Sequence, residues 1–154
     1  MQIAIATDHN GSIIKNEIKR YLTNKGYQVI DCSPSSHPTD DYSDYAIKTS
    51  EVVASGKANV GILICGTGIG MSIVANKVKG IRCAHITNVN DAILAREVNY
   101  ANMIAIGAKI NINENLKMID VFLNTEFGKE ERYIRNANKI IKYENGEYIP
   151  VNQD

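Results

Sequence analysis

The stretch NVGILIC, residues 59–65, constrains the fold more than any other part of the chain. After its first residue it is apolar throughout, without the polar alternation of a half-exposed strand. A strand of this kind is buried on both faces and is typical of the centre of a parallel sheet. Such a sheet needs helices on its faces, and the rest of the chain has to supply them.

Strand and helix patterns alternate along the whole chain. The sequence predicts strands at residues 2–7, 27–32, 59–65, 81–87 and 102–108, the last of which closes the sheet. It predicts helices at about residues 11–26, 42–56, 68–79, 89–99, 113–125 and 129–142. The short links between them favour an α/β fold, a doubly wound sandwich on a five-stranded parallel sheet. We expect a single domain over residues 1–154, with a C-terminal helix and tail from about residue 129.

The charge balance and the cysteine pattern exclude several function classes. Seventeen basic residues offset seventeen acidic ones, so the chain has no electrostatic footprint for nucleic acid or an anionic membrane. We expect no membrane span and no signal peptide. The three cysteines form no C-x-x-C pair, which argues against a disulfide framework or a zinc site and favours the cytoplasm. Any anion bound here should be small and held at a local site.

The turn CGTGIG, residues 65–70, is the first candidate site. Ligands of open α/β sheets bind beyond the C-terminal ends of the strands, where this turn is expected to lie. Its G-x-G-x-G spacing matches neither the dinucleotide fingerprint nor the P-loop. Backbone N–H groups at a helix start attract anions. The same glycines also suit a tight strand–helix turn, so both interpretations are open.

Cys65 is the candidate catalytic group of that turn. A thiol beside the positive end of a helix is favoured in its thiolate form. Cysteine is also among the most buried residue types, and we interpret Cys32 and Cys83 in that way. The glycine neighbours distinguish Cys65 from both.

Other polar residues are expected at the same crevice. Asp8 and His9 end the first strand, where Asp8 also suits a helix cap. Tyr42 opens a helix within an acidic stretch that ordinarily compensates the helix dipole, and it is placed to cover the site. His85 falls inside a predicted strand, where we interpret it as a satisfied core histidine.

Three late cations have two interpretations. Lys109 follows the fifth strand, and Arg132 and Arg135 lie on the last helix. Charges in such places commonly form a solvated face. If they cluster, they provide a grip for a phosphate.

Four segments in this order, IAIATDHNG, DDYSDYA, GILICGTGIGMSIVANKVKGIR and NMIAIGAK, resemble the type B ribose-5-phosphate isomerases and the related galactose-6-phosphate isomerase subunits. The resemblance covers about residues 2–135. It implies a Rossmann-like three-layer αβα sandwich and aldose–ketose isomerisation of a sugar phosphate, with no cofactor and no metal. It also implies a homodimer or homotetramer with active sites between subunits, a hetero-oligomer being the alternative.

The resemblance also assigns roles to residues. Cys65 corresponds to the catalytic base, with Thr67 as an added hydroxyl donor. Lys109 stands where the family has a phosphate-binding arginine. Arg132 matches the first of two late arginines, and Arg135 lies one residue before the position of the second. The candidate substrate-binding set is Asp8, His9, Tyr42, Gly66, Thr67, Gly68, Ile69, Gly70, Asn99, Lys109, Arg132 and Arg135.

One position departs from the family pattern. The family has Arg-x-His-Asn before the last strand, and its histidine opens the sugar ring, whereas this chain has Val98 there, in Arg96-Glu97-Val98-Asn99. In this respect the chain resembles the galactose-6-phosphate isomerase subunit that has the glycine turn and the cysteine, which also lacks the histidine. We expect a sugar-phosphate isomerase, with ribose 5-phosphate as substrate and an enediolate intermediate. The alternatives are a subunit of a hetero-oligomeric galactose-6-phosphate isomerase and a non-catalytic sugar-phosphate-binding protein.

Overall fold

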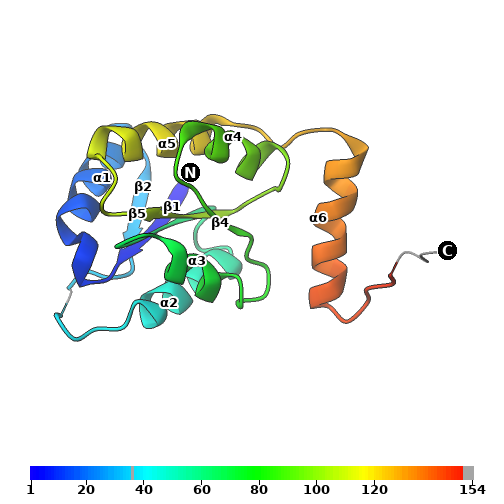
Figure 1. The fold of residues 1–154 in the computed structure, drawn as a ribbon, viewed down its shortest axis with the longest axis horizontal. Helices are drawn as coiled ribbons and strands as arrows, with labels where there is room; N and C mark the ends of the chain where they lie inside the picture. Colours follow the sequence, from blue (N-terminus) through cyan, green and yellow to red (C-terminus); the bar gives the residue numbers. More distant parts are fainter. Residues whose placement is uncertain (36, 151–154) are drawn as a thin grey trace.

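A computed structural model describes residues 1–35 and 37–150 (Figure 1). Its five strands are parallel and form one sheet in the order β2-β1-β3-β5-β4. The strands are β1 (Gln2–Thr7), β2 (Gln28–Asp31), β3 (Val60–Cys65), β4 (Cys83–His85) and β5 (Met103–Gly107). The predicted fold class is confirmed. Residue 36 and the last four residues of the expected domain lie outside the described ranges.

Helices cover both faces of the sheet. They are η1 (His9–Gly11), α1 (Ser12–Asn24), α2 (Tyr42–Ala54), α3 (Ile69–Ala75), α4 (Val89–Glu97), α5 (Ile112–Asn124) and α6 (Glu131–Glu144). Helices α1, α4 and α5 pack on one face, and α2 and α3 on the other (Figure 1). The three layers follow from the sequence of β1, since successive side chains of a strand point to opposite faces. Ile3 and Ile5 pack with the first group of helices, and Ala4 and Ala6 with the second.

Two expectations about the far half of the sheet were wrong. Strand β5 does not close the sheet. It lies between β3 and β4, and all five of its residues are buried. The edge strand is β4, which has only three residues and not seven.

Helix α3 is also shorter than predicted, because Asn76 ends it. The Asn76 side-chain N–H donates to the Cys83 carbonyl at 2.8 Å, and the Cys83 N–H donates back to Asn76 Oδ1 at 2.8 Å. A side-chain amide thus takes the place of a neighbouring strand at the edge of the sheet.

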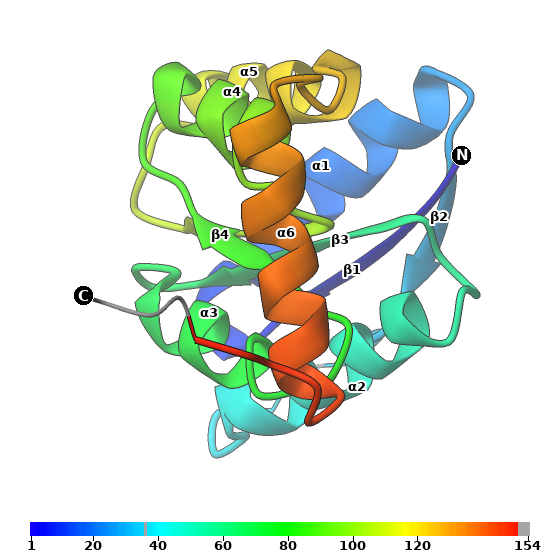
Figure 2. The same cartoon turned by 90° about the vertical axis from the view of Figure 1, so that its right-hand side faces the viewer.

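Helix α6 lies on neither face of the sheet. It crosses the end of the sheet where the strands begin (Figure 2). The Gly128 N–H donates to the Glu97 carbonyl at 2.9 Å, which ties the approach to α6 to the end of α4. Ala137 is its single buried residue, and its apolar side chains Ile134, Ile140, Ile141 and Tyr143 are exposed. Within residues 1–35 and 37–150, no helix combines the length and the hydropathy needed to cross a bilayer.

Candidate active site

The glycine turn follows β3 at the C-terminal end of the sheet. Gly68 is in the left-handed region with φ at 86°, just before α3 begins at Ile69. A Cβ on Gly68 would lie 3.0 Å from the backbone N and C of Ile106 and 3.0 Å from Cδ2 of His85. Both the backbone angle and the neighbouring strand therefore require glycine at this position.

The turn directs its backbone donors at its own side chains. The Gly68 N–H donates to Cys65 Sγ at 3.1 Å. The Ile69 N–H donates to Thr67 Oγ1 at 3.2 Å. Cys65 is 6% exposed, and Thr67 is exposed. The thiol therefore lies at the edge of the core with a backbone donor already aimed at the sulfur.

The other two cysteines have different surroundings. Burial raises the pKa of the Cys83 thiol to about 12. Burial also raises the pKa of Cys32, against the opposing effect of a hydrogen bond with Thr49. Both are neutral thiols near pH 7, as expected for core residues.

His9 is held beside the turn by an acid that the sequence analysis did not assign. The His9 Nδ1–H donates to Asp40 at 2.8 Å, and the Tyr45 hydroxyl donates to the other oxygen of Asp40 at 2.9 Å. The hydrogen bond to Asp40 raises the pKa of His9, assisted by the charge of Asp8. Burial works to raise the pKa of Asp40, but the His37 backbone N–H, His9 and Tyr45 outweigh it and lower the value to about 2.

Asp8 and Tyr42 lie at the same end of the sheet. Asp8 is 5% exposed and accepts a hydrogen bond from the Asn10 N–H at 2.9 Å, so its capping role is present. Tyr42, at the start of α2, lies over Gly70, where an added Cβ would come 2.7 Å from Cζ of the Tyr42 ring. Tyr42 therefore covers the first turn of α3.

Strand β5 brings Lys109 to this end as well. Gly107 is the register partner of Cys65, and the Ala108 N–H donates to the Cys65 carbonyl at 2.8 Å. A Cβ on Gly107 would lie 3.2 Å from the carbonyl oxygens of Gly66 and Thr67. Exposed Lys109 follows two residues later. The sequence analysis did not identify Gly107. A single glycine after an apolar run carries no sign that it will contact the glycine turn.

The remaining candidates lie at the opposite end of the sheet. Asn99 follows α4 and precedes β5, and its side chain donates to the Leu94 carbonyl at 2.9 Å. Met103, the first residue of β5, lies about 13 Å from the level of Gly107, given the rise of a parallel strand. Arg132 and Arg135 are exposed on α6. One chain therefore does not bring these three residues to Cys65.

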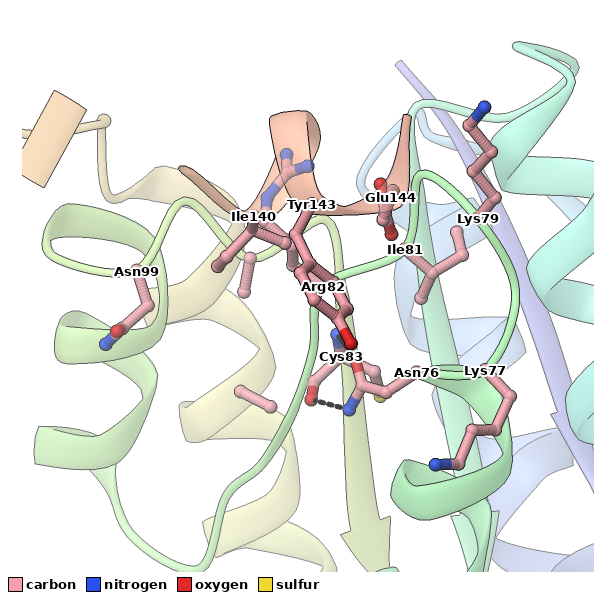
Figure 3. Close-up of a pocket in the computed structure, with 12 residues that line it drawn as sticks. Asn76, Lys77, Lys79, Ile81, Arg82, Cys83, Asn99, Ile140, Tyr143 and Glu144 are labelled. Carbon is pink, nitrogen blue, oxygen red and sulfur yellow. Dashed lines mark hydrogen bonds between the residues drawn. The ribbon is translucent and has the colours of Figure 1, made fainter. Parts of the chain in front are cut away.

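A cavity of about 740 Å³ lies at this second end, between α6 and the beginning of β4 (Figure 3). Arg82 lines it and donates from Nε to the Tyr100 carbonyl at 2.7 Å, and burial lowers the pKa of the Arg82 guanidinium. On the side of α6, Glu144 accepts the Gly80 N–H at 3.1 Å. Asn76, Lys77, Cys83, Asn99, Ile140 and Tyr143 also line the cavity.

Comparison with known proteins decides the family. The model of the ribose/galactose isomerase family matches residues 3–140. The chain belongs to this family. It is therefore an aldose–ketose isomerase, as the motifs predicted.

Individual family members agree over nearly the full length. Ribose-5-phosphate isomerase B of Escherichia coli is 41% identical, with 82% of this chain and 85% of that protein covered. Galactose-6-phosphate isomerase subunit LacB of Clostridium acetobutylicum is 38% identical, with 96% and 88% covered.

Solved structures agree with the fold. Ribose-5-phosphate isomerase B of Clostridium thermocellum superposes with a TM-score of 0.90 at 41% identity, covering 95% of this chain and 99% of that one. The Mycoplasma genitalium ribose-5-phosphate isomerase B with bound ribulose-5-phosphate gives a TM-score of 0.89 at 37% identity, covering 94% and 96%.

Proposed function

We propose that this chain interconverts ribose 5-phosphate and ribulose 5-phosphate, with Cys65 as the base. The observation that carries the proposal is the Gly68 N–H directed at Cys65 Sγ over 3.1 Å. A hydrogen-bond donor directed at an acidic group such as a thiol favours its anionic form. The substrate is supported by relatives named ribose-5-phosphate isomerase B and by the one that holds ribulose-5-phosphate. The free state of all three cysteines accords with the reducing cytoplasm.

The proton transfers balance without an oxidant or reductant. The Cys65 thiolate removes the proton from carbon 2 of the open-chain aldose, and the C–H electron pair forms the double bond between carbons 1 and 2. The oxygen on carbon 1 takes the negative charge, which gives an enediolate. The proton of the carbon 2 hydroxyl then moves to that oxygen, the carbonyl forms at carbon 2, and carbon 1 takes the proton from the Cys65 thiol.

The glycine turn stabilises charge that exists only along this path. In this mechanism the oxygens of the enediolate face the Thr67 hydroxyl and those backbone N–H groups of residues 66–70 that are not directed at Cys65 Sγ or Thr67 Oγ1. Because the negative charge is absent from the substrate, such donors stabilise the transition state more than the ground state. One positioned donor of this kind is worth roughly 3 kcal/mol. The phosphate is held by cations, with His9 and Lys109 already at this end.

We propose that a second copy of the chain completes the site. Asn99, Arg132 and Arg135 are separated from Cys65 by the length of the sheet, yet the family resemblance places them with the substrate. Helix α6 carries Arg132 and Arg135 and exposes isoleucine and tyrosine side chains that a partner would bury. A homodimer in which α6 and the end of α4 reach the partner's glycine turn satisfies both requirements. A homotetramer built from such dimers retains the same site.

Hydrogen exchange at carbon 2 tests the reaction. The purified protein should form ribulose 5-phosphate from ribose 5-phosphate in heavy water and incorporate deuterium. Pentose and hexose phosphates tested in parallel define the sugar. Binding of ribose 5-phosphate without exchange would contradict the proposal and indicate a binding protein.

Val98 favours a second candidate function. Without the family histidine, the chain resembles the galactose-6-phosphate isomerase subunit that depends on a partner subunit. If that is its role, the pure homo-oligomer should be inactive on galactose 6-phosphate and gain activity with the complementary subunit. Full activity of the pure protein on ribose 5-phosphate excludes this role.

We also predict that Val98 makes ring opening slow. Turnover of ribose 5-phosphate should be slow relative to carbon 2 exchange on an open-chain analogue. Val98→His should speed the former and leave the latter unchanged, because only ring opening needs that group. If turnover is fast, unaffected by Val98→His and lost in His9→Asn, ring opening belongs to His9.

A further inference from the structure

His85 lies against the glycine turn although it belongs to the edge strand β4. Its ring Nε2 is 2.8 Å from the carbonyl oxygen of Thr67. Because a carbonyl oxygen only accepts, this contact assigns the ring proton to Nε2. The ring atom next to Nε2, Cδ2, lies 3.0 Å from the position of a Cβ added to Gly68. His85 therefore contacts both residues of one peptide unit.

The same peptide unit faces Cys65. The Thr67 carbonyl and the Gly68 N–H belong to a single planar trans peptide, whose C=O and N–H point in opposite directions. His85 donates to the first, and the second donates to Cys65 Sγ at 3.1 Å. The chain of contacts runs from the imidazole N–H, through the peptide, to the sulfur.

Glycine at position 68 makes this peptide easy to invert. A flip of the Thr67–Gly68 peptide moves the φ of Gly68 from 86° to the opposite sign, and glycine accepts both regions. After a flip the carbonyl would face the sulfur and oppose a thiolate. The turn requires glycine at position 68, and glycine by itself does not favour one orientation of the peptide. A contact with another residue therefore has to hold the Thr67–Gly68 peptide in its orientation.

We propose that His85 is a positioning residue that fixes the Thr67–Gly68 peptide so that its N–H faces Cys65. The inference rests on the proposed function, in which the Cys65 thiolate is the base. His85 acts in two ways. Its hydrogen bond holds the peptide plane, and the polarised carbonyl strengthens the N–H as a donor, because linked hydrogen bonds reinforce one another.

Two substitutions separate the donor from the ring. His85→Phe keeps an aromatic ring on Gly68 and removes the N–H, whereas His85→Gln removes the ring and keeps an amide N–H that can reach the Thr67 carbonyl. Thr87→Val is the matched control, because it deletes a side-chain hydrogen bond to Asp91 just beyond β4 and leaves the turn untouched.

The decisive readout is the thiolate absorbance at 240 nm, taken as the difference from the same variant carrying Cys65→Ala. In His85→Phe its pH midpoint should rise by about one unit, the expected effect of a weakened hydrogen bond to a charged group. The rate of carbon 2 exchange on an open-chain analogue, which needs no ring opening, should fall about tenfold, with the KM for the analogue nearly unchanged. His85→Gln should restore most of both values, and Thr87→Val should match the unmodified protein.

Each other outcome overturns the inference. An unchanged midpoint and an unchanged carbon 2 exchange rate in folded His85→Phe show that the donor is not needed. Failure of folded His85→Gln to recover both values shows that the ring alone matters. If His85→Phe does not fold, nitrogen-15 NMR of the unmodified protein decides, since a proton absent from Nε2 contradicts the contact. If Cys65→Ala retains turnover, the proposed function fails, while the absorbance midpoints still test His85.

Discussion

The two ends of the sheet differ in what they offer to chemistry. The end with Cys65 carries two separate hydrogen bonds, one from the Gly68 N–H to Cys65 Sγ and one from His9 to Asp40. The end with α6 has a cavity of about 740 Å³, and several polar groups at this end hold the fold. Asn76 pairs with the backbone of Cys83 there, and the Asn102 side chain pairs with the backbone of Arg82 and Gly80.

The two ends of the sheet also differ in the surroundings of their cysteines. Cys65 has a backbone donor aimed at its sulfur, whereas burial raises the pKa of Cys83 to about 12. Both are buried, so exposure does not distinguish them. Cys65 has, in addition to burial, the N–H of Gly68 directed at its sulfur.

The largest expected effect is the loss of the base. Cys65→Ala should lower kcat on ribose 5-phosphate by about 10²–10⁴-fold, the range for a positioned acid–base group, with little change in substrate affinity. Cys83→Ala, the matched control at the other end, should change kcat by less than about twofold. Steady-state kinetics and direct binding measure both. Retention of most turnover in Cys65→Ala would remove the distinction between the ends.

The next effect tests whether the two ends meet across copies of the chain. Arg132→Ala should lower kcat/KM by about 10- to 100-fold, since a hydrogen bond between charged groups is lost. Mixing unfolded Arg132→Ala and Cys65→Ala proteins and refolding them together should recover about a quarter of the wild-type activity, because half of the dimers are mixed and each has one intact site. No recovery, with mixed dimers verified by mass spectrometry, means that Arg132 does not act across the interface.

A smaller effect concerns the stability of the turn. Gly68→Ala should lower the free energy of unfolding by about 2 kcal/mol or more, since the left-handed angle and the backbone of Ile106 both oppose a Cβ. At Gly66 a Cβ meets nothing within 4 Å, so Gly66→Ala should change stability by less than about 0.5 kcal/mol. Urea unfolding at one protein concentration compares them. Equal losses would show that the turn is not held as described.

The smallest expected effect is a shift in the pH dependence of the KM for ribose 5-phosphate. Asp40 raises the pKa of His9, so the imidazolium persists to higher pH than in a free histidine and, in the proposed site, can hold the phosphate over that range. In Asp40→Asn the KM for ribose 5-phosphate should therefore begin to rise at lower pH than in the unmodified protein. Asp44→Asn, in the same acidic stretch, should leave the profile in place. An unchanged profile in Asp40→Asn would show that His9 does not bind the phosphate in its charged form.

The contribution of the His9–Asp40 pair to the stability of the fold changes with pH in a defined direction. The pKa of His9 is raised on folding, so its contribution is complete below its unfolded value and is lost as the pH rises through the folded value. The pKa of Asp40 is about 2, so its contribution is present above the unfolded value and is lost as the pH falls toward 2. The pair stabilises the fold most between these limits.

Local patterns predicted most elements of the chain within a few residues. The apolar run of β3 and the helical spacing of α1 are features of neighbouring residues, and each held in the structure. The ends of α3 and β4 were misjudged because the side chains of Asn76 and Asn102 bind backbone seven and twenty residues away in the sequence. A hydropathy pattern gives no sign that a side-chain amide will hydrogen-bond to an edge strand in the place of another strand.

The linear chain was sufficient for the fold class, the glycine turn after β3 and the family, since these depend on periodicity and on contiguous residues. Three-dimensional packing settled the order of β4 and β5, the contact of Asp40 with His9 and that of His85 with Thr67. It also placed Asn99 and Arg132 at the opposite end of the sheet from Cys65. The physical reason is that each strand runs from one end of the sheet to the other. Residues before a strand and residues after it are therefore separated by its full length, although they are close in sequence.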